Sequence, residues 1–186
     1  RCTLMLRSFS IFALIILTTY SNAEIKNKII QNLKETNNLD FNFEQNINGK
    51  IEKGNCTIEY PKKIFCVYAK SNNKILISNG KSLVIKTSTS YYRYPIEKTP
   101  LNIILDKNFL INKISELSER IIDENLINFK ILEKNNEINV FFDNQTYDLI
   151  GWQNKDIYQN FNITFLSIVS KNRSLPNNLF KLPSHD

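Results

Sequence analysis

Residues 74–86, Lys-Ile-Leu-Ile-Ser-Asn-Gly-Lys-Ser-Leu-Val-Ile-Lys, place a short apolar run on each side of Asn79-Gly80. An Asn-Gly pair between two apolar runs is the strongest short-range signal for a β-hairpin, because both residues readily adopt the positive φ of its tight turn. The stretch therefore predicts two antiparallel strands, and similar patterns occur before and after it.

A second hairpin is predicted immediately upstream, with its turn at Pro61-Lys62. Pairing its strands places Cys56 opposite Cys66 and Ile58 opposite Ile64, so that all four side chains share one face. In an oxidising compartment we expect a cross-strand disulfide, and two buried free thiols are the alternative. No CxxC pair or Cys/His cluster accompanies these cysteines, so a structural role is predicted instead of metal or thiol chemistry.

Helices are predicted on both sides of the hairpins. The apolar positions of residues 25–38 recur at helical spacing and indicate an amphipathic helix. Thr99-Pro100 is typical of a helix start, with Thr99 as the N-cap and Pro100 at the first helical position. The apolar pattern of residues 109–122 continues this helical region, as one helix or as two.

Alternating apolar residues indicate further strands around the central helical region. They are Phe41–Ile47, Tyr91–Tyr94, Phe129–Leu132, Ile138–Phe142, Tyr147–Trp152 and Phe161–Val169. The order is a helix, about five strands, one or two helices and about four strands. It predicts an α+β fold in which a long antiparallel sheet buries one face beneath helices.

Residues 1–23 have the pattern of an export signal. A basic residue precedes the apolar run Phe9–Leu17, and Ser21 and Ala23 are small residues placed as signal cleavage requires. We expect cleavage after Ala23, export to the periplasm and one domain over residues 24–186. A membrane anchor is the alternative, but the run is about half of the roughly twenty residues that span a bilayer. No cysteine stands at the expected cleavage point, so no lipid attachment is expected there.

The composition excludes several classes of function. The chain is 42% hydrophobic and 23% charged, with a formal net charge of +6, and contains one histidine, His185. A histidine-dependent hydrolase or a His-rich metal site is therefore not expected. The sequence has no phosphate-binding loop, dinucleotide-binding glycine pattern or nucleophile elbow, so we predict no catalytic residue, metal or cofactor. Lys62-Lys63 is the only adjacent basic pair, which argues against nucleic acid and leaves a modest attraction to anionic lipid headgroups.

Several stretches taken together resemble the LolA family, the periplasmic carriers of outer-membrane lipoproteins. The resemblance covers nearly all of the chain after the export signal. It rests on the order and spacing of the matching stretches. The matching stretches are Phe43-Glu44-Gln45 with Gly49 and Gly54, Tyr60–Cys66, Ser78–Leu83, Thr99-Pro100-Leu101, Trp152 with Asp156, Asn160–Ile163, Asn172, and Leu179–Pro183.

This resemblance implies an unclosed antiparallel β-barrel, covered by a lid of a few helices around a hydrophobic cavity. The implied protein is a monomeric periplasmic chaperone that takes acylated lipoproteins from an inner-membrane ABC transporter complex to an outer-membrane receptor. Tyr60 stands where the family has an arginine that helps to hold the lid, so Tyr60 is the candidate latch, with one hydroxyl donor in place of five N–H donors. Cys66 replaces an inward-facing tryptophan of the family.

Candidate cavity residues follow from the resemblance and the apolar pattern, and ordinary core packing is the alternative for each. Candidates for the acyl-chain wall are Phe41, Phe43, Ile58, Ile64, Leu83, Ile85, Phe141 and Trp152. Candidates for the helical lid are Ile29, Leu33, Leu101, Ile104 and Leu105.

Three other functions are alternatives to the carrier. A membrane-tethered receptor of the same fold requires a lipid-attachment cysteine that does not follow the apolar run. An envelope-stress regulatory module of this fold, which senses lipids or lipoproteins, is the main alternative. An exported hydrolase requires a nucleophile and a base that the sequence does not offer.

Overall fold

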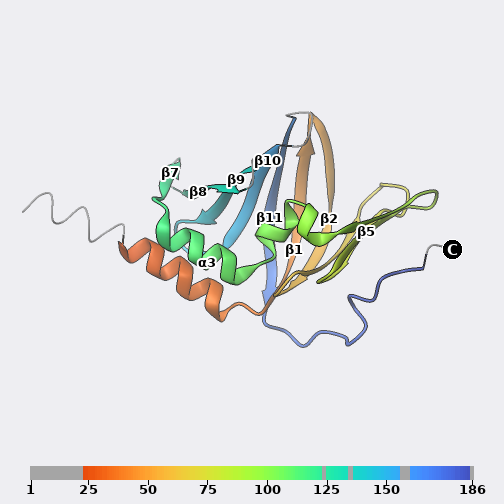
Figure 1. Cartoon of the computed structure of the whole chain (residues 1–186), viewed down its shortest axis with the longest axis horizontal. Helices are drawn as coiled ribbons and strands as arrows, with labels where there is room; N and C mark the ends of the chain where they lie inside the picture. The colour runs from red at the N-terminus through yellow and green to blue at the C-terminus, as the bar shows by residue number, and fades with distance from the viewer. Residues whose placement is uncertain (1–22, 123–124, 134–135, 156–159, 185–186) are drawn as a thin grey trace, which may run out of the picture.

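Eleven antiparallel strands form one curved sheet in a computed structural model that describes residues 23–122, 125–133, 136–155 and 160–184. The strand order is β6-β5-β4-β3-β2-β1-β11-β10-β9-β8-β7, so β6 and β7 are the edges and the barrel is not closed (Figure 1). The strands are β1 (Asn38–Ile47), β2 (Lys50–Glu59), β3 (Lys63–Tyr68), β4 (Ile75–Asn79), β5 (Ser82–Lys86), β6 (Tyr91–Pro95), β7 (Arg120–Ile122), β8 (Leu126–Glu133), β9 (Asn136–Asp143), β10 (Leu149–Lys155) and β11 (Phe161–Lys171).

The helices lie on the concave side of this sheet (Figure 1). They are an N-terminal helix at residues 23–35, the 3-10 helix η1 (Ile96–Lys98), α2 (Leu101–Ile104) and α3 (Lys107–Glu116). The predicted α+β class and the unclosed antiparallel barrel with a helical cover are confirmed. The predicted export signal lies outside the described residues except for Ala23, which is the first residue of the N-terminal helix. In the described part of the chain, no helix is long and apolar enough to cross a bilayer.

The two predicted hairpins are confirmed. β4 and β5 flank Gly80, which has a φ of 93°. In β2 and β3, Cys56 lies opposite Cys66, and a disulfide joins them. Ile58 lies opposite Ile64, as expected.

The helical region after β6 differs from the prediction at both ends. Thr99 is not the N-cap of α2, since its hydroxyl donates to the Ile96 carbonyl (2.8 Å) and Pro100 occupies the capping position. The helical pattern also stops early, because α3 ends at Glu116 and Arg120–Ile122 form the edge strand β7. The adjacent β-branched residues in that strand favour extended backbone over helix.

The N-terminal helix and α3 run antiparallel and exchange lysine contacts at their ends. Lys26, near the start of the first helix, donates to the carbonyl of Leu117 (3.0 Å) at the end of α3. Lys107, at the start of α3, donates to the carbonyl of Thr36 (2.8 Å) just beyond the first helix. Each ammonium group therefore satisfies carbonyls at a helix C-terminus, where a cation is also favoured by the helix dipole.

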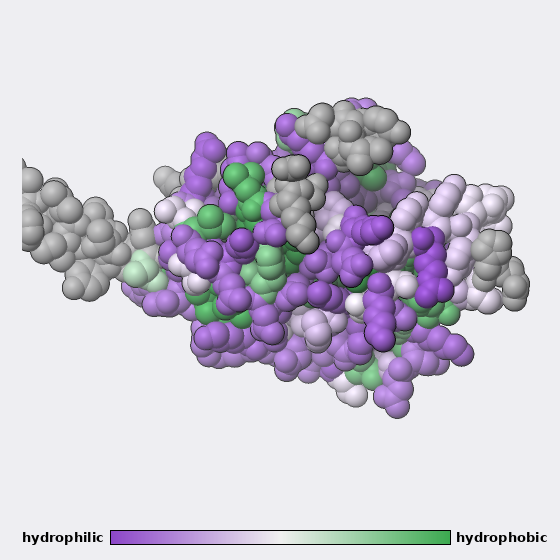
Figure 2. Space-filling model, viewed as in Figure 1, coloured by the Kyte–Doolittle hydropathy of each residue, from purple (hydrophilic) through white to green (hydrophobic). Residues whose placement is uncertain are grey.

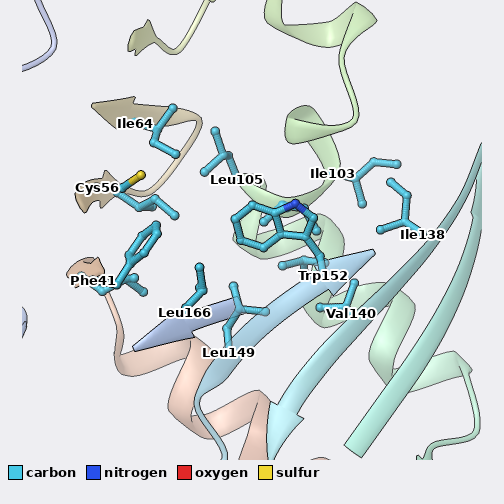
Figure 3. Close-up of a cluster of buried hydrophobic side chains, with 14 of the residues drawn as sticks. Phe41, Cys56, Ile64, Ile103, Leu105, Ile138, Val140, Leu149, Trp152 and Leu166 are labelled. Carbon is cyan, nitrogen blue, oxygen red and sulfur yellow. The ribbon is translucent and has the colours of Figure 1, made fainter. Parts of the chain in front are cut away.

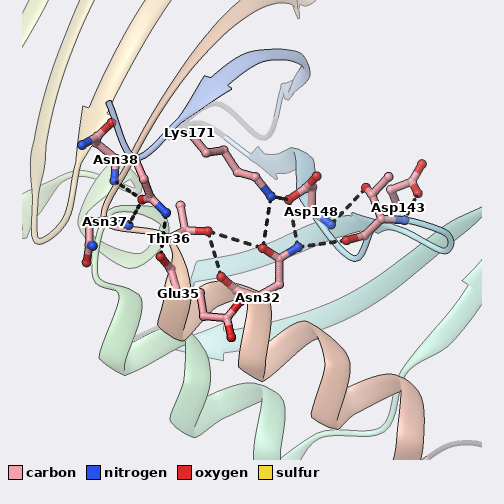
Figure 4. A network of polar contacts seen from close by, with 10 residues as sticks. Asn32, Glu35, Thr36, Asn37, Asn38, Asp143, Asp148 and Lys171 are labelled. Carbon is pink, nitrogen blue, oxygen red and sulfur yellow. Dashed lines mark hydrogen bonds and ion pairs between the residues drawn. The ribbon is translucent and has the colours of Figure 1, made fainter. Parts of the chain in front are cut away.

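A polar network ties the N-terminal helix to the sheet (Figure 4). The Asn32 amide donates to the Asp148 carboxylate (2.8 Å), which also accepts from Lys171 (2.7 Å). The Asn172 side chain donates to the carbonyl of Glu35 (2.9 Å). These contacts hold the helix over β10 and β11.

The centre of the sheet is the pairing of β1 with β11, which are far apart in sequence. On the convex side, the Asp40 carboxylate of β1 accepts hydrogen bonds from Thr57 (2.5 Å), from Ser170 (2.8 Å) and from the guanidinium of Arg173 (2.9 Å). The hydrogen bond from Arg173, with those from the two hydroxyls, lowers the pKa of Asp40 from 3.8 to about 2 against the opposing effect of burial. Asp40 therefore joins β1, β2, β11 and the following C-terminal segment.

We expect Asp40→Asn to lower the free energy of unfolding by about 2 kcal/mol at pH 7. The folded-state pKa of Asp40 is depressed, so its stabilisation is fully present above pH 3.8 and is lost as the pH falls toward about 2. The difference between the wild type and the variant should therefore shrink over that range, as measured by urea denaturation followed by circular dichroism.

Glu44→Gln on the same strand is the matched control, because the exposed Glu44–Lys53 ion pair (2.6 Å) is expected to contribute about 0.5 kcal/mol or less. A loss for Asp40→Asn that stayed constant between pH 7 and pH 2 would contradict the assignment.

Candidate functional site

A cavity of about 260 Å³ lies between the concave face of the sheet and the segment that begins α2. Most of its wall comes from β1 to β5, with contributions from β10 and β11. Its apolar and aromatic lining consists of Phe41, Phe43, Ile47, Cys56, Ile64, Cys66, Tyr68, Leu76, Leu83, Ile85, Pro100, Leu101 and Trp152. Its other lining residues are Gln45, Lys74, Thr99, Asn154, Asn162 and Thr164.

Cross-strand register explains how the wall forms. Phe41 pairs with Cys56, Cys56 with Cys66, Cys66 with Leu76, and Leu76 with Ile85. This row contains one residue from each of β1 to β5, and all five line the cavity. Side chains directly opposite each other on antiparallel strands share a face, so the register fixes a continuous apolar strip with the disulfide at its centre.

The other half of the concave face is filled. The N-terminal helix and α3 cover it, and Ile127, Phe129, Ile138, Val140 and Phe142 of β8 and β9 are all fully buried in the core that includes residues of both helices. The hydrophobic face of the sheet thus has a packed half beneath two helices and a hollow half beneath α2.

Trp152 lies at the boundary between these halves. Its side chain is nearly buried and lines the cavity. Figure 3 shows the indole between the α2 segment, with Ile103 and Leu105, and the sheet, with Val140. Trp152 is the only tryptophan of the chain.

Six of the eight predicted wall residues line the cavity: Phe41, Phe43, Ile64, Leu83, Ile85 and Trp152. Ile58 is fully buried in the core and is not among the lining residues. Of the predicted lid, only Leu101 lines the cavity. The other four lid candidates, Ile29, Leu33, Ile104 and Leu105, are buried in the core cluster.

The structure places Phe141 on the convex face, outside the cavity. Phe141 pairs with Gly151, and its ring stacks on that of Phe165 with centroids 5.9 Å apart. Its neighbours Val140 and Phe142 point into the core instead. Three consecutive apolar residues do not reveal which face each one takes, so the assignment of Phe141 to the wall is corrected here.

A polar end of the cavity was not predicted from the sequence. The Gln45 amide donates to Asn162 (3.0 Å) and to Thr164 (3.1 Å), and all three side chains line the cavity. Gln45 lies two residues after Phe43 on the same strand face, so the continued alternation of β1 was the available signal. The apolar criterion used for the candidates excluded it.

Lys74 also lines the cavity, in an ion pair with Glu52 (2.6 Å) and 4.0 Å from the centre of the Tyr68 ring. The Glu52 side chain is 5% exposed. Burial alone would raise the pKa of Glu52, but hydrogen bonds from Lys74 and Lys50 hold it below its ordinary value. The pair adds polarity to the wall with little net charge.

Lys62, instead of Tyr60, connects the β2–β3 turn to the end of α2 and the start of α3. The Lys62 backbone N–H donates to the carbonyl of Leu105 (2.8 Å), and its ammonium group pairs with Asp106 (3.2 Å). Asp106 is also the N-cap of α3, where its carboxylate accepts from the N–H of Phe109 (3.1 Å). One carboxylate thus starts α3 and holds the end of α2 against the sheet.

The Tyr60 hydroxyl, predicted as the latch, is buried without a hydrogen-bond partner among the described residues. Burial raises the pKa of Tyr60 well above its usual value. The ring packs against the core, so Tyr60 contributes apolar contact instead of a polar latch.

This arrangement can bind an amphiphile. An apolar chain can lie along the strip on β1 to β5, and a polar neutral group can hydrogen-bond to the carboxamides and hydroxyl at the other end. No group of three or more His, Cys, Asp or Glu side chains that could hold a metal occurs among the described residues.

Comparison with known proteins gives one family match. The model of the family "Outer membrane lipoprotein carrier protein LolA" matches residues 34–183. A LolA superfamily protein from Nitrosomonas europaea is 7% identical, covering 87% of this chain and 97% of that one, with a TM-score of 0.45. LprF from Mycobacterium bovis is 12% identical, with coverages of 84% and 96% and a TM-score of 0.45. The Mycobacterium tuberculosis lipoprotein LppX is 12% identical, with coverages of 83% and 98% and a TM-score of 0.44. No curated protein matches the chain.

The contacts of Lys62 and Asp106, and the unpartnered hydroxyl of Tyr60, predict opposite changes in stability for two substitutions. Tyr60→Phe should leave the free energy of unfolding unchanged or raise it by up to about 1 kcal/mol, because it removes a buried hydroxyl that has no partner. Asp106→Ala should lower it by about 1–2 kcal/mol, because the cap of α3 is lost. Urea denaturation followed by circular dichroism measures both.

Lys62→Met separates the two roles of Asp106, since it removes the ion pair and keeps the cap. We expect it to cost less than Asp106→Ala. A loss of more than about 1 kcal/mol for Tyr60→Phe would instead restore the hydroxyl as the latch.

Proposed function

The chain belongs to the family of outer membrane lipoprotein carrier proteins, LolA, and on this basis we propose that it is a periplasmic chaperone that binds the acyl chains of lipoproteins in the cavity described above. It would accept lipoproteins from an inner-membrane ABC transporter complex and deliver them to an outer-membrane receptor. This role requires binding and release and no catalytic group.

The hollow half of the concave face is the observation that supports this proposal best. A strip of apolar side chains from five adjacent strands borders the cavity, and the start of α2 lines the cavity with it. Each CH₂ group moved from water to such a surface contributes about 0.8 kcal/mol. About ten CH₂ groups of an acyl chain would therefore contribute roughly 8 kcal/mol, the free energy that corresponds to a micromolar dissociation constant.

The size of the cavity supports a lid that moves. Pockets for drug-sized ligands measure about 300–1,000 Å³, whereas this one measures about 260 Å³ and holds only part of one chain. Room for more requires α2 to move away from the sheet. The segment is one turn long and is held at its end by the contacts of Lys62, but it also buries Ile103, Ile104 and Leu105 in the core. Opening therefore exposes these three side chains unless the ligand replaces their contacts.

Filling the cavity tests the proposed site. Ile85 is half-buried and lines the cavity, so Ile85→Trp should occupy the space of the ligand. We expect at least about tenfold weaker binding of a fluorescent triacylated lipopeptide, which corresponds to about 1.4 kcal/mol. The full chain, purified after export, is titrated with the lipopeptide and the change in anisotropy is recorded.

Ile163→Trp is the matched control. Ile163 is also half-buried on a strand, but it lies beside Asn46 and Gln153 on the convex face. The Ile163→Trp variant should bind the lipopeptide as the wild type does. Equal binding by both variants would place the ligand elsewhere.

The carrier role is tested with membranes. Inner-membrane vesicles that contain a lipoprotein and the cognate transporter are mixed with the protein and ATP, and a soluble one-to-one complex is sought by sedimentation and native mass spectrometry. Failure to release the lipoprotein contradicts the carrier role for that cargo. Lipid binding without release favours the alternative, a sensor module of the same fold.

A further inference from the structure

The segment formed by β4 to β6, their connecting turns and η1 holds an unusual share of the positive charge. We define the β4–β6 wing as residues 70–98, which contain six basic residues and one acidic residue, Glu97. The remainder of residues 24–186 has 16 basic and 17 acidic residues and is close to neutral. The basic residues of the wing are Lys70, Lys74, Lys81, Lys86, Arg93 and Lys98.

The contacts of these side chains leave most of the charge at the surface. Lys74 is neutralised by the buried Glu52, but Lys70, Lys81 and Lys98 are exposed. Arg93 is exposed and donates to the hydroxyl of Ser82 (3.0 Å), a partner that carries no charge. The wing therefore presents a net positive surface.

Two tyrosines extend the cavity wall to the edge of the sheet within this wing. Tyr92 pairs with Ile85 and Tyr94 pairs with Leu83, and both aliphatic residues line the cavity. The two tyrosine side chains are 53% and 44% exposed. An aromatic surface thus runs from the cavity to β6, an outer strand of the sheet.

The location of the wing fits docking on a flat surface. The strands of the wing project beyond the N-terminal helix and α3 at one end of the molecule (Figure 1). Hydrophilic residues dominate the face seen in Figure 2, with hydrophobic residues in separate patches. Exposed tyrosines next to basic side chains are typical of the interface between a membrane and water, where aromatic rings lie at headgroup level and cations attract anionic lipids.

We propose that the β4–β6 wing is a docking surface for an anionic lipid bilayer, with Tyr92 and Tyr94 at headgroup level and Lys70, Lys81 and Lys98 against the lipid phosphates. This proposal goes beyond the carrier function, since it concerns the membrane itself instead of a protein partner, and it can fail while acyl-chain binding holds. Charge complementarity selects anionic over neutral lipid. Continuity of the tyrosines with the cavity wall favours a bilayer over an acidic protein.

Vesicle flotation tests the proposal with the full chain purified after export. Vesicles of phosphatidylethanolamine with 30% phosphatidylglycerol are compared with vesicles of phosphatidylcholine alone. We expect about tenfold or greater preference for the anionic vesicles at low salt, weakened at high salt because exposed charges are screened. Similar binding to both kinds of vesicle, or binding to neither, overturns the proposal.

Charge variants locate the surface. Lys70→Glu/Lys81→Glu/Lys98→Glu should lower binding to anionic vesicles about tenfold or more. The matched control, Lys34→Glu/Lys130→Glu/Lys181→Glu, changes the net charge equally at residues outside the wing. Equal losses in both triple variants would mean that only net charge matters and would overturn the proposal. Lipopeptide binding by the wing variant should remain as in the wild type, which separates this test from that of the carrier function.

Tyrosine variants test the aromatic part. Tyr92→Ser/Tyr94→Ser should lower vesicle binding several-fold at both salt concentrations, and Tyr92→Phe/Tyr94→Phe should retain most of it. Circular dichroism verifies that each variant is folded. Unchanged vesicle binding by the serine variant overturns the proposal. Binding to soluble polyaspartate as strong as to anionic vesicles also overturns it, in favour of an acidic protein partner.

Discussion

The antiparallel pairing of β1 with β11 is the interaction on which the rest of the structure depends. It joins a six-stranded meander to a five-stranded one and so makes a single sheet from two parts of the chain that helices separate. Without this ladder, the two meanders would not form one continuous apolar face for the helices to cover. The Asp40 cluster strengthens the junction on the convex side, where its carboxylate joins side chains from β2, from β11 and from the segment after β11.

An unequal distribution of helices over this sheet then produces the cavity. The N-terminal helix and α3 supply enough apolar side chains to fill the half formed by β7 to β10, whereas α2 offers one turn to the half formed by β1 to β5. The apolar strip on that second half belongs to the same core and is nearly all buried, yet it borders a cavity that no described side chain fills. A ligand that supplies the missing apolar surface gains free energy without displacing a packed core, which is the physical basis of the proposed function.

The sequence predicts which strands pair locally better than it predicts what covers each face of the sheet. The Asn79-Gly80 turn and the Cys56–Cys66 register follow from short-range rules and are confirmed. Periodicity identifies which residues face inward, but it does not reveal whether helix, ligand or nothing covers them, so Ile29 and Leu33 of the packed half were grouped with true cavity residues. Tyr60 was assigned by position in a motif, whereas the contact to the lid comes from its neighbour Lys62, whose role depends on tertiary geometry. An apolar pattern does not identify Gln45, whose polar side chain lines the cavity.

The position of Trp152 allows its fluorescence to report on the cavity. The chain has one tryptophan, so tryptophan fluorescence has a single source, and its indole lines the cavity at the boundary of the packed half. Emission shifts with the polarity around the indole, so arrival of a hydrocarbon chain and withdrawal of α2 should move the spectrum in opposite directions. Loading and unloading can therefore be followed in real time without attaching a label to the protein or to its cargo.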